Sequence, residues 1–310
     1  MYKYRFSVFT ATYNRALSLP VVYDCLLKQS FKSFEWIIVN DGSKDDTDQV
    51  CAKFIDDGIL DIKYIRKENG GKHTAWRVAT KEFEGQYVVG ADDDDLYPVD
   101  MLKILDYHWS QLEKREDYSN FWEVKGRCAD GAGSLVGKPL PMAVFDSDYN
   151  TVFFIMKHTY EMQGCRKVEV LRYEAAVPEH FIYDENCSNF PEGIRWSRAA
   201  RFYKTRFIDE VLRIYNSDTT GRLCSKNSGA KRNARITYNT LVGSIYNLIE
   251  NRDLLIQYNK IFYIKNLAIL TYTSICLKKN PFVQCRLTLF EKACLLFMYL
   301  PLYCVHYFRR

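Results

Sequence analysis

The stretch "YVVGADDDDLYP", residues 87–98, places four consecutive aspartates directly behind an apolar run. The apolar run has the composition of a buried β-strand. Four adjacent carboxylates repel one another, so a compensating charge is needed where this strand ends. A divalent cation would supply it, because Mg²⁺ and Mn²⁺ are held by one or two carboxylates together with the phosphate oxygens of a substrate. Alone, the run is weak evidence, since acidic runs are common on protein surfaces.

The first hundred residues alternate between strand and helix patterns. Apolar, β-branched runs that end in polar turn residues predict strands, and a 3.6-residue periodicity between them predicts helices. The expected strands are 5–14, 34–43, 60–65 and 86–95, and the expected helices are 17–29, 47–55 and 73–83. This alternation predicts an α/β fold with a mainly parallel central sheet flanked by helices.

The rest of the chain has a less regular pattern. We expect helices at 100–114 and 191–203, strands at 167–173 and 205–215, a glycine-rich loop at 124–141, and helices from about residue 231 onward. The sequence therefore predicts a helical extension at the C-terminal end of the α/β fold.

Charge is unevenly distributed, although the net charge is only +5. From Arg222 onward, fourteen Lys and Arg residues accompany three Asp and Glu residues, and the preceding part has an acidic excess. A basic, aromatic tail indicates an anionic partner such as a membrane surface. Nucleic acid is not expected, because the basic residues form no recognised binding motif and the body is acidic.

The ten cysteines are scattered and include no CxxC pair, which predicts neither a zinc site nor a disulfide framework. We expect reduced thiols in a cytoplasmic protein. The N-terminal residues lack the pattern of a secretory signal.

The last apolar stretch, residues 293–308, lies between Lys292 and the pair Arg309–Arg310. It is shorter than the roughly 20 residues of a membrane span, and Pro301 is expected to break it. We expect a helix in the membrane interface, at the inner face of the cell membrane. The alternative is a buried helix packed on the catalytic domain.

Three further polar residues follow the predicted strands. The Asp41 carboxylate could accept a hydrogen bond from a pyrimidine N3–H, and the Tyr13 ring could stack on that base. Lys72 follows a glycine turn at a helix start, a position suited to phosphate oxygens. Ligands of such sheets bind beyond the carboxyl ends of the strands. The alternatives are a turn aspartate, a core ring and a solvated lysine.

Four segments together resemble the nucleotide-sugar-binding half of the family 2 glycosyltransferases of the non-processive bacterial type, which have the GT-A fold. They are "TATYNRA", "WIIVNDGSKDDT", "ENGGKHTA" and "YVVGADDDDLYP", and the resemblance covers roughly residues 4–100 and resumes at 190–215. It implies inverting transfer of one sugar from a UDP-sugar to a glycan or lipid-linked acceptor in surface polysaccharide biosynthesis, with Mn²⁺ or Mg²⁺. It also implies a GT-A catalytic domain over 1–220, with halves 1–100 and 101–220, and a basic helical region over 221–310.

The resemblance assigns roles to individual residues. It implies nucleotide-sugar binding by Ala11, Thr12, Tyr13, Arg15, Asp41, Lys72, Asp92 and Asp93, and metal binding by Asp92 and Asp94. A register shifted by one, Asp93–Asp95, stays open because every position is aspartate.

The catalytic base implied by the resemblance is Glu192, four residues before Trp196 at a helix start. Asp184 and Glu185 are the alternatives, and a helix N-terminus favours glutamate in any case. The segment also resembles the QxxRW box of processive synthases, but the separate base motif and the membrane spans of those enzymes are not found. Arg195 and Arg198 could contact the diphosphate or the acceptor.

Two other functions stay open. A sugar-phosphate nucleotidyltransferase usually has a glycine-rich loop after the first strand, and "TATYNRALSL" has no glycine. A catalytically inactive nucleotide-sugar-binding module would bind the donor without releasing UDP.

Overall fold

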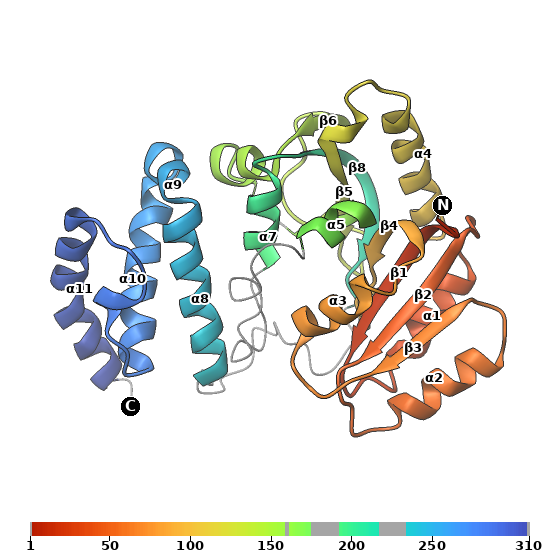
Figure 1. The fold of residues 1–310 in the computed structure, drawn as a ribbon, viewed down its shortest axis with the longest axis horizontal. Coiled ribbons are helices and arrows are strands. Elements are labelled where there is room, and N and C mark those ends of the chain that lie inside the picture. The colour runs from red at the N-terminus through yellow and green to blue at the C-terminus, as the bar shows by residue number, and fades with distance from the viewer. Residues whose placement is uncertain (1, 159–160, 175–191, 217–233, 309–310) are drawn as a thin grey trace. The chain divides into compact units, whose positions relative to one another are not determined.

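The computed structural model describes residues 2–158, 161–174, 192–216 and 234–308. The chain forms two compact units. The first comprises Met1–Asp148, His158–Phe181 and Phe202–Lys226, and the second comprises Tyr149–Lys157, Ile182–Arg201 and Asn227–Arg310. Of the described residues, the segment 192–201 belongs to the second unit, within the sequence range expected for the catalytic domain. Figure 1 labels the elements of both units, which we describe separately.

The first unit is built on an eight-stranded mixed sheet with the order β3-β2-β1-β4-β7-β5-β8-β6. Its strands are β1 (Tyr4–Thr12), β2 (Phe34–Asn40), β3 (Ile62–Arg66), β4 (Gly85–Gly90), β5 (Phe121–Ala129), β6 (Val144–Ser147), β7 (Gln163–Lys167) and β8 (Lys204–Ile214). The strands β3, β2, β1 and β4 are parallel, as predicted. Beyond β4, β7 is antiparallel to both neighbours and β6 is antiparallel to β8, whereas β5 and β8 are parallel, so this half of the sheet is mixed.

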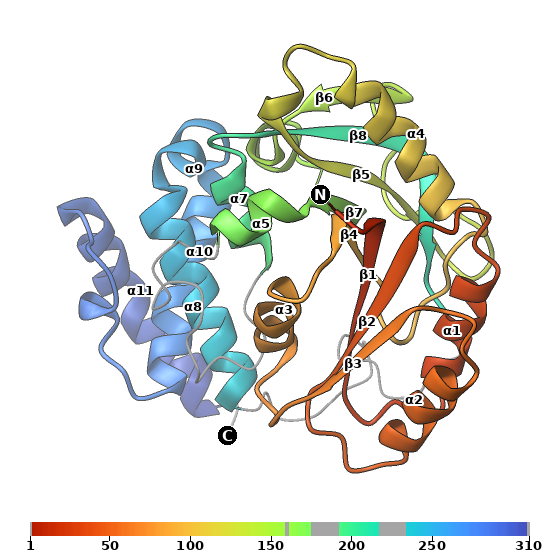
Figure 2. The ribbon, with the colours of Figure 1, turned by 45° about the vertical axis from the view of Figure 1, so that its right-hand side comes forward.

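Helices cover both faces of this sheet (Figure 2). They are α1 (Leu19–Leu27), α2 (Thr47–Asp56), α3 (Lys72–Thr80), α4 (Met101–Glu113) and α5 (Val168–Glu174), with a short 3-10 turn η1 (Tyr118–Asn120). Successive side chains of a strand point to opposite faces. Phe6 therefore packs in a cluster with α1 and α4, and Phe9 contacts Trp76 of α3, with ring centroids 4.3 Å apart. The expected helices in this region are confirmed.

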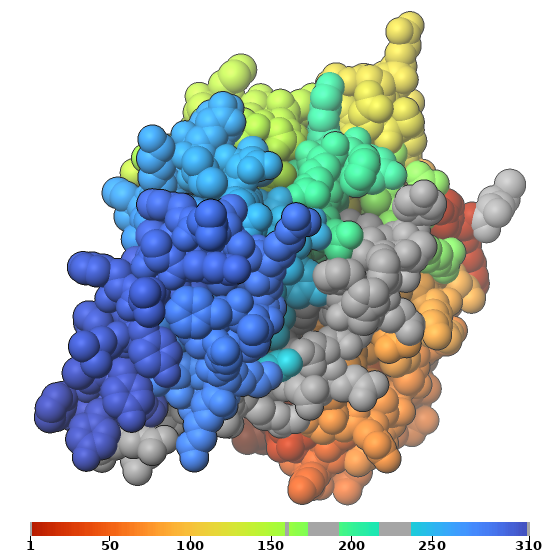
Figure 3. Space-filling model, turned by 60° about the vertical axis from the view of Figure 1, so that its left-hand side comes forward, coloured from red at the N-terminus to blue at the C-terminus, as the bar shows by residue number. Residues whose placement is uncertain are grey.

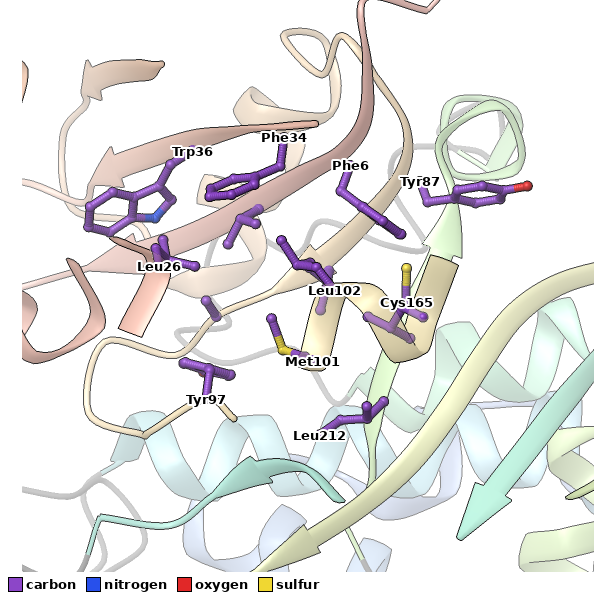
Figure 4. Packing of buried hydrophobic residues seen from close by; sticks show 14 of the residues in the cluster. Phe6, Leu26, Phe34, Trp36, Tyr87, Tyr97, Met101, Leu102, Cys165 and Leu212 are labelled. Carbon is purple, nitrogen blue, oxygen red and sulfur yellow. The ribbon is translucent and has the colours of Figure 1, made fainter. Parts of the chain in front are cut away.

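The main core lies between the sheet and the helices α1, α2 and α4. Figure 4 shows Phe6, Phe34 and Trp36 of the strands packed near Leu26 and Leu102 of the helices. All are buried. This apolar layer holds β1, β2 and β4 in register, so that their last residues reach the same edge of the sheet.

Two sequence-based expectations in this unit are wrong. Residues 168–174 form the helix α5 instead of a strand, because the strand β7 has already ended at Lys167. Local β-branched composition is overridden here by packing of the segment against β4 and β7. The expected glycine-rich loop contains the end of β5, whose nine residues are all buried. A Cβ on Gly126 would lie 2.6 Å from Leu212, so this glycine serves close strand packing and not a turn.

The second unit is helical, as predicted. It contains a π-helical turn η2 (Thr151–Ile155), α7 (Glu192–Ala199), α8 (Ala234–Glu250), α9 (Arg252–Tyr258), α10 (Lys260–Cys276), a 3-10 turn η3 (Pro281–Val283) and α11 (Leu289–Phe308). Its core is a leucine cluster from α8 to α11 that includes Leu241, Leu248, Leu267 and Leu295.

The last helix, α11, differs from the sequence analysis in two respects: it is not broken at Pro301, and it is not buried. Pro301 does not break it, and α11 runs unbroken over 20 residues. Pro301 is exposed, so the backbone carbonyl that it leaves unpaired can be hydrated. A buried core helix is also wrong, because only Glu291 and Leu295 of α11 are buried. Among the described residues, α11 is the one helix long and apolar enough to cross a membrane, by length and composition only.

Candidate active site

The predicted strand-end residues meet at one edge of the first unit's sheet. The strands β1, β2 and β4 run in the same direction, and the Asp41 amide donates to the Thr12 carbonyl at 2.8 Å. The strand β8 ends at this edge too, because Leu96, just after the aspartate run, bridges Ile214. Four strand ends therefore bring their polar residues together, which is where ligands bind in sheets of this kind.

The loops after β1 and β2 are joined by reciprocal hydrogen bonds. The Asn14 amide donates to Ser43 Oγ at 2.9 Å, and the Lys44 amide donates to Asn14 Oδ1 at 2.7 Å. Asn14 adopts the left-handed conformation, with φ of 55°. Beside it the Tyr13 side chain is 43% exposed, so the alternative of a core ring is wrong. Of the preceding residues, Ala11 is half-buried and Thr12 is buried.

Asp41 is buried and its carboxylate organises the loop that leads into α3. One oxygen accepts from Lys67 Nζ at 2.5 Å and from the Gly70 amide at 3.0 Å. The other accepts from the Gly71 amide at 2.7 Å and from Asn69 Nδ2 at 3.3 Å. Two donors on each oxygen fill the usual acceptor capacity of a carboxylate. A hydrogen bond from a base N–H to Asp41 therefore requires one of these donors to move.

Lys72 begins α3 and is paired with the first aspartate of the run. Its Nζ lies 2.6 Å from Asp92 Oδ1. The helix is entered through Gly71 at φ of 92°, a conformation that glycine adopts without steric cost. Lys72 is thus held at the sheet edge by an ion pair.

The other oxygen of Asp92 is paired with Arg213, near the end of β8. The guanidinium lies 3.1 Å from Asp92 Oδ2 and 3.6 Å from Asp95 Oδ2, and it also contacts Glu161 at 2.6 Å. Arg213 and Asp95 are both buried. Asp95 further accepts from the Asn216 amide at 3.4 Å, so it ties the aspartate loop to β8.

Arg15 lies near Asp93 and Asp94, the two middle aspartates of the run. Its guanidinium lies 3.6 Å from Asp93 Oδ1 and 3.5 Å from Asp94 Oδ2. These separations are long for charge-assisted hydrogen bonds, which are usually 2.7–2.9 Å. Four carboxylates are therefore held together by three cations from the protein itself, Arg15, Lys72 and Arg213.

Burial and these cations spread the pKa values of the run. Burial opposes ionisation of Asp92, but the charges of Lys72 and Arg213 outweigh it and hold the pKa of Asp92 at about 2. Burial raises the pKa of Asp93 to about 7, although Arg15 acts in the opposite direction. Burial likewise raises the pKa of Asp95 to about 6 against the attraction of Arg213. Perturbed pKa values in one cluster are typical of functional sites.

The acidic run fits a divalent cation that a substrate helps to bind. Within the described ranges, no three His, Cys, Asp or Glu side chains are placed to hold a metal by themselves. The Asp94 side chain is 20% exposed and, within the described part of the chain, has a single contact, at 3.5 Å with Arg15, whereas Asp95 is buried beside Arg213 of β8. One or two carboxylates completed by diphosphate oxygens are a usual set for Mg²⁺ or Mn²⁺.

The predicted base lies in the second unit. Glu192 is exposed and begins α7. The helix is fixed within its own unit, because Ser197 Oγ donates to Asn150 or Asn251, each 2.6 Å away. Arg195 and Arg198 lie on the same helix. The alternatives Asp184 and Glu185 fall outside the described residues.

Sequence reasoning missed Arg213, Lys67 and Asn69. Arg213 lies in a segment expected only to be a strand, and its position at the carboxyl end of that strand was the available signal. Lys67 and Asn69 stand beside the glycine turn. Their bonds to Asp41 depend on a loop conformation that no local pattern specifies.

Comparisons with known proteins agree with this geometry. Residues 7–114 match the family model Glycosyl transferase family 2. The chain is 37% identical over 226 residues to an uncharacterized glycosyltransferase of Rickettsia bellii, covering 71% of this chain and 31% of that protein. It is 32% identical over 114 residues to poly(ribitol-phosphate) beta-N-acetylglucosaminyltransferase TarS of Staphylococcus aureus, covering 35% and 20%. The chain spans less than a third of the length of these and the other first curated relatives.

Solved structures agree on the fold. The structure of S. aureus TarS residues 1–349 in complex with UDP superposes with a TM-score of 0.61 at 16% identity, covering 99% of this chain and 92% of that one. The mannosyltransferase PcManGT of Pyrobaculum calidifontis, in complex with GDP-Man and Mn²⁺, superposes with a TM-score of 0.50 at 16% identity, covering 98% and 74%. The fold is thus of the GT-A class. With the matching family model, the chain contains a glycosyltransferase family 2 domain over residues 7–114.

Proposed function

We propose that this protein is a metal-dependent, inverting glycosyltransferase that moves one sugar from a UDP-sugar to a hydroxyl of a glycan or lipid-linked acceptor. The observation that carries the proposal is the meeting of Tyr13, Asp41, Lys72 and Asp92–Asp94 at one sheet edge. The names of two relatives support an acceptor in surface polysaccharide biosynthesis: TarS, and the minor teichoic acid biosynthesis protein GgaB of Bacillus subtilis.

The donor is oriented by the first two strand-end loops. The exposed Tyr13 ring offers a face on which the uracil base stacks. Asp41 receives the base N3–H when Lys67 moves aside, since the other three donors to Asp41 belong to the loop backbone or to Asn69. Ala11 and Thr12 at the end of β1, and Arg15 beside Asp93 and Asp94, belong to the same proposed donor site. The solved complex of TarS with UDP-GlcNAc supports a UDP-sugar as the donor.

The diphosphate binds when basic side chains exchange their aspartate partners for phosphate oxygens. Asp94, with Asp92, would hold a Mn²⁺ or Mg²⁺ ion, which neutralises charge on the leaving diphosphate when bound. Lys72 is 39% exposed and paired with Asp92, so it can turn its ammonium from that carboxylate to a phosphate oxygen. Arg15 can do the same from its long contacts with Asp93 and Asp94. Asp95 stays with Arg213, which favours the register Asp92–Asp94.

Transfer requires a carboxylate that takes the proton from the acceptor hydroxyl while that oxygen attacks the anomeric carbon. We assign this role to Glu192. A Glu192→Gln variant should lose transfer by about 1,000-fold while donor binding is retained, because general-base catalysis contributes about 100- to 10,000-fold. Transfer assays and calorimetry with the UDP-sugar measure the two effects. Near-normal transfer by this variant would move the role to another carboxylate.

The whole proposal is tested by release of UDP across a panel of UDP-sugars, with and without added Mn²⁺. One UDP-sugar should support metal-dependent release, and release should increase when a hydroxyl acceptor is present. Binding of UDP-sugar without any release would show an inactive binding module instead.

We also propose that the second unit contacts an anionic membrane, which places the enzyme at the inner face of the cell membrane. The apolar face of α11 supports this, since Leu296 is 70% and Phe297 83% exposed. An amphipathic helix with basic residues lies in the interface of anionic bilayers. Co-sedimentation with anionic vesicles should be strong, and should fall when Leu296 and Phe297 are both replaced by Asn.

A further inference from the structure

The second unit contains a pocket at the end of α10. Its volume is about 530 Å³, and it is formed by the end of α10, the turn with η3, and α11. The lining includes Lys278, Lys279, Phe282, Tyr299 and Tyr303. Volumes of 300–1,000 Å³ are typical of small-molecule sites. Two ammonium groups and two phenols are donors without any carboxylate among them, which suits an anion with several oxygen acceptors.

The segment that forms the pocket is strongly basic. Between residues 259 and 308 the chain has six Lys and Arg residues and a single carboxylate, that of Glu291. Glu291 is buried and engaged by Arg252 at 2.8 Å and by the Tyr263 hydroxyl at 2.9 Å. It therefore does not neutralise Lys278 or Lys279, and the pocket is electrostatically complementary to an anion.

Lys278 occupies a backbone position that normally belongs to glycine. Its φ is 55°, and the Lys279 and Lys278 amides donate to Ser274 and Ile275 at 2.8 and 3.1 Å. These two bonds define a Schellman motif, in which the left-handed residue is usually Gly. A lysine here is conformationally costly, which suggests that its side chain is retained for another purpose. Lys279 is also positioned, since its ammonium lies 4.7 Å from the centroid of the Tyr238 ring.

The pocket adjoins the exposed apolar face of α11. In Figure 3 the dark-blue atoms of the C-terminal helices lie at the front, where no other described segment covers them. Tyr299 and Tyr303 belong to both features, with ring centroids 6.3 Å apart in a stacked arrangement. Tyrosine is enriched where apolar and aqueous phases meet. A ligand here would place its charged end on the lysines and its apolar part along α11.

We propose that this pocket binds the phosphate group of an anionic membrane lipid, with Lys278 and Lys279 on the phosphate oxygens and the acyl chains along α11. The inference rests on the proposed membrane contact of the second unit and names its ligand. It predicts that the lipid headgroup binds in this pocket specifically. General attraction between a basic protein surface and an anionic membrane would not require the pocket.

The test compares two pairs of substitutions that remove equal charge. Lys278→Gly with Lys279→Gln changes the pocket, and Lys260→Gln with Lys265→Gln changes exposed lysines of α10 outside it. Binding to phosphatidylcholine vesicles that contain phosphatidylglycerol is measured by co-sedimentation. Each lysine near an anionic membrane contributes about 1 kcal/mol, so the pocket pair should weaken binding about 30-fold and the control pair less than about threefold. Lys278→Gly alone should bind about fivefold more weakly without a lower melting temperature, because glycine suits this backbone.

Equal losses from the two pairs would overturn the proposal, since net charge alone would then explain binding. Saturable binding of soluble glycerol 3-phosphate to the intact chain, abolished by the pocket pair, would also overturn it and indicate a soluble phosphate ligand. Neither pair touches the proposed catalytic edge, so both should retain UDP release in solution. If the unmodified chain released no UDP, that result would contradict the proposed enzyme activity. It would not contradict the lipid site.

Discussion

Two acidic sites at the same sheet edge are held in opposite ways. Asp41 accepts four hydrogen bonds, all from the loop between β3 and α3 and two of them from backbone amides. The run Asp92–Asp95 has mostly ion pairs, several of them at 3.5–3.6 Å. Short bonds to backbone amides fix Asp41, whereas long contacts to flexible cations can be exchanged. The comparison indicates that Asp41 builds the site and that Asp93 and Asp94 remain available for a ligand.

The largest expected effect on activity comes from replacing Asp94, whose contact with Arg15 can be exchanged for a ligand. Asp94→Asn should lower metal-dependent UDP release by about 1,000-fold, because charge stabilisation by a bound metal contributes several kcal/mol. Asp117→Asn is the control, since Asp117 also pairs with an arginine but lies at the exposed contact with Arg115. Steady-state assays with Mn²⁺ measure both variants. Similar activity of the two would show that Asp94 is not a metal ligand.

Replacing Arg213 tests whether the stability of the chain depends on the ion pairs of Arg213 with Asp92 and Asp95. Arg213→Met should lower the free energy of unfolding by about 4 kcal/mol, because removal of one partner leaves a buried charge uncompensated. Arg213→Lys should recover part of this loss. Arg115→Met, at an exposed pair, should cost less than about 1 kcal/mol. Urea denaturation measures these free energies of unfolding. A decrease for Arg213→Met no larger than that for Arg115→Met would show that Arg213 does not stabilise the aspartate run.

The pH dependence of stability separates Asp93 from its neighbours. Its pKa of about 7 in the folded chain lies above the unfolded value of about 3.9. The folded state thus loses stability as pH rises from about 4 to 7, and at pH 8 the loss is complete. In metal-free buffer, Asp93→Asn should be more stable than the unmodified chain at pH 8 by about 4 kcal/mol, and the gain should be nearly absent at pH 4. A gain that does not depend on pH would refute the shifted titration.

Asp41 should show the smallest effect and the opposite sign. Asp41→Asn should lower the free energy of unfolding by about 2 kcal/mol, since the amide cannot accept on both atoms and leaves backbone donors unpaired. Asp94→Asn removes a contact of 3.5 Å with Arg15 and should change stability much less. Equilibrium unfolding of both variants without metal compares them directly. A larger loss for Asp94→Asn would reverse the distinction between the two acidic sites.

Much of this edge could be predicted from the sequence because strand-end motifs are local. The positions of Tyr13, Asp41, Lys72 and Asp92 follow from where each strand stops, and the parallel order of β1, β2 and β4 gathers them. Arg213 could not be predicted, since its contact with Asp92 depends on how β8 enters the sheet. Residues 167–173 were expected to be a strand because composition alone does not show that β7 ends at Lys167. The roles of Asp41 and Glu192 in the reaction stay predictions.

The ion pair between Arg213 and Asp92 joins residues 121 positions apart in the chain. During synthesis, the acidic edge therefore emerges from the ribosome well before its main internal counter-charge does. The segment 7–114 that matches the family model lacks β8. If it were expressed alone, it would carry an aspartate cluster that repels itself. Insertion of the late strand β8 thus adds Arg213 as the third cation, beside Arg15 and Lys72, which segment 7–114 already contains.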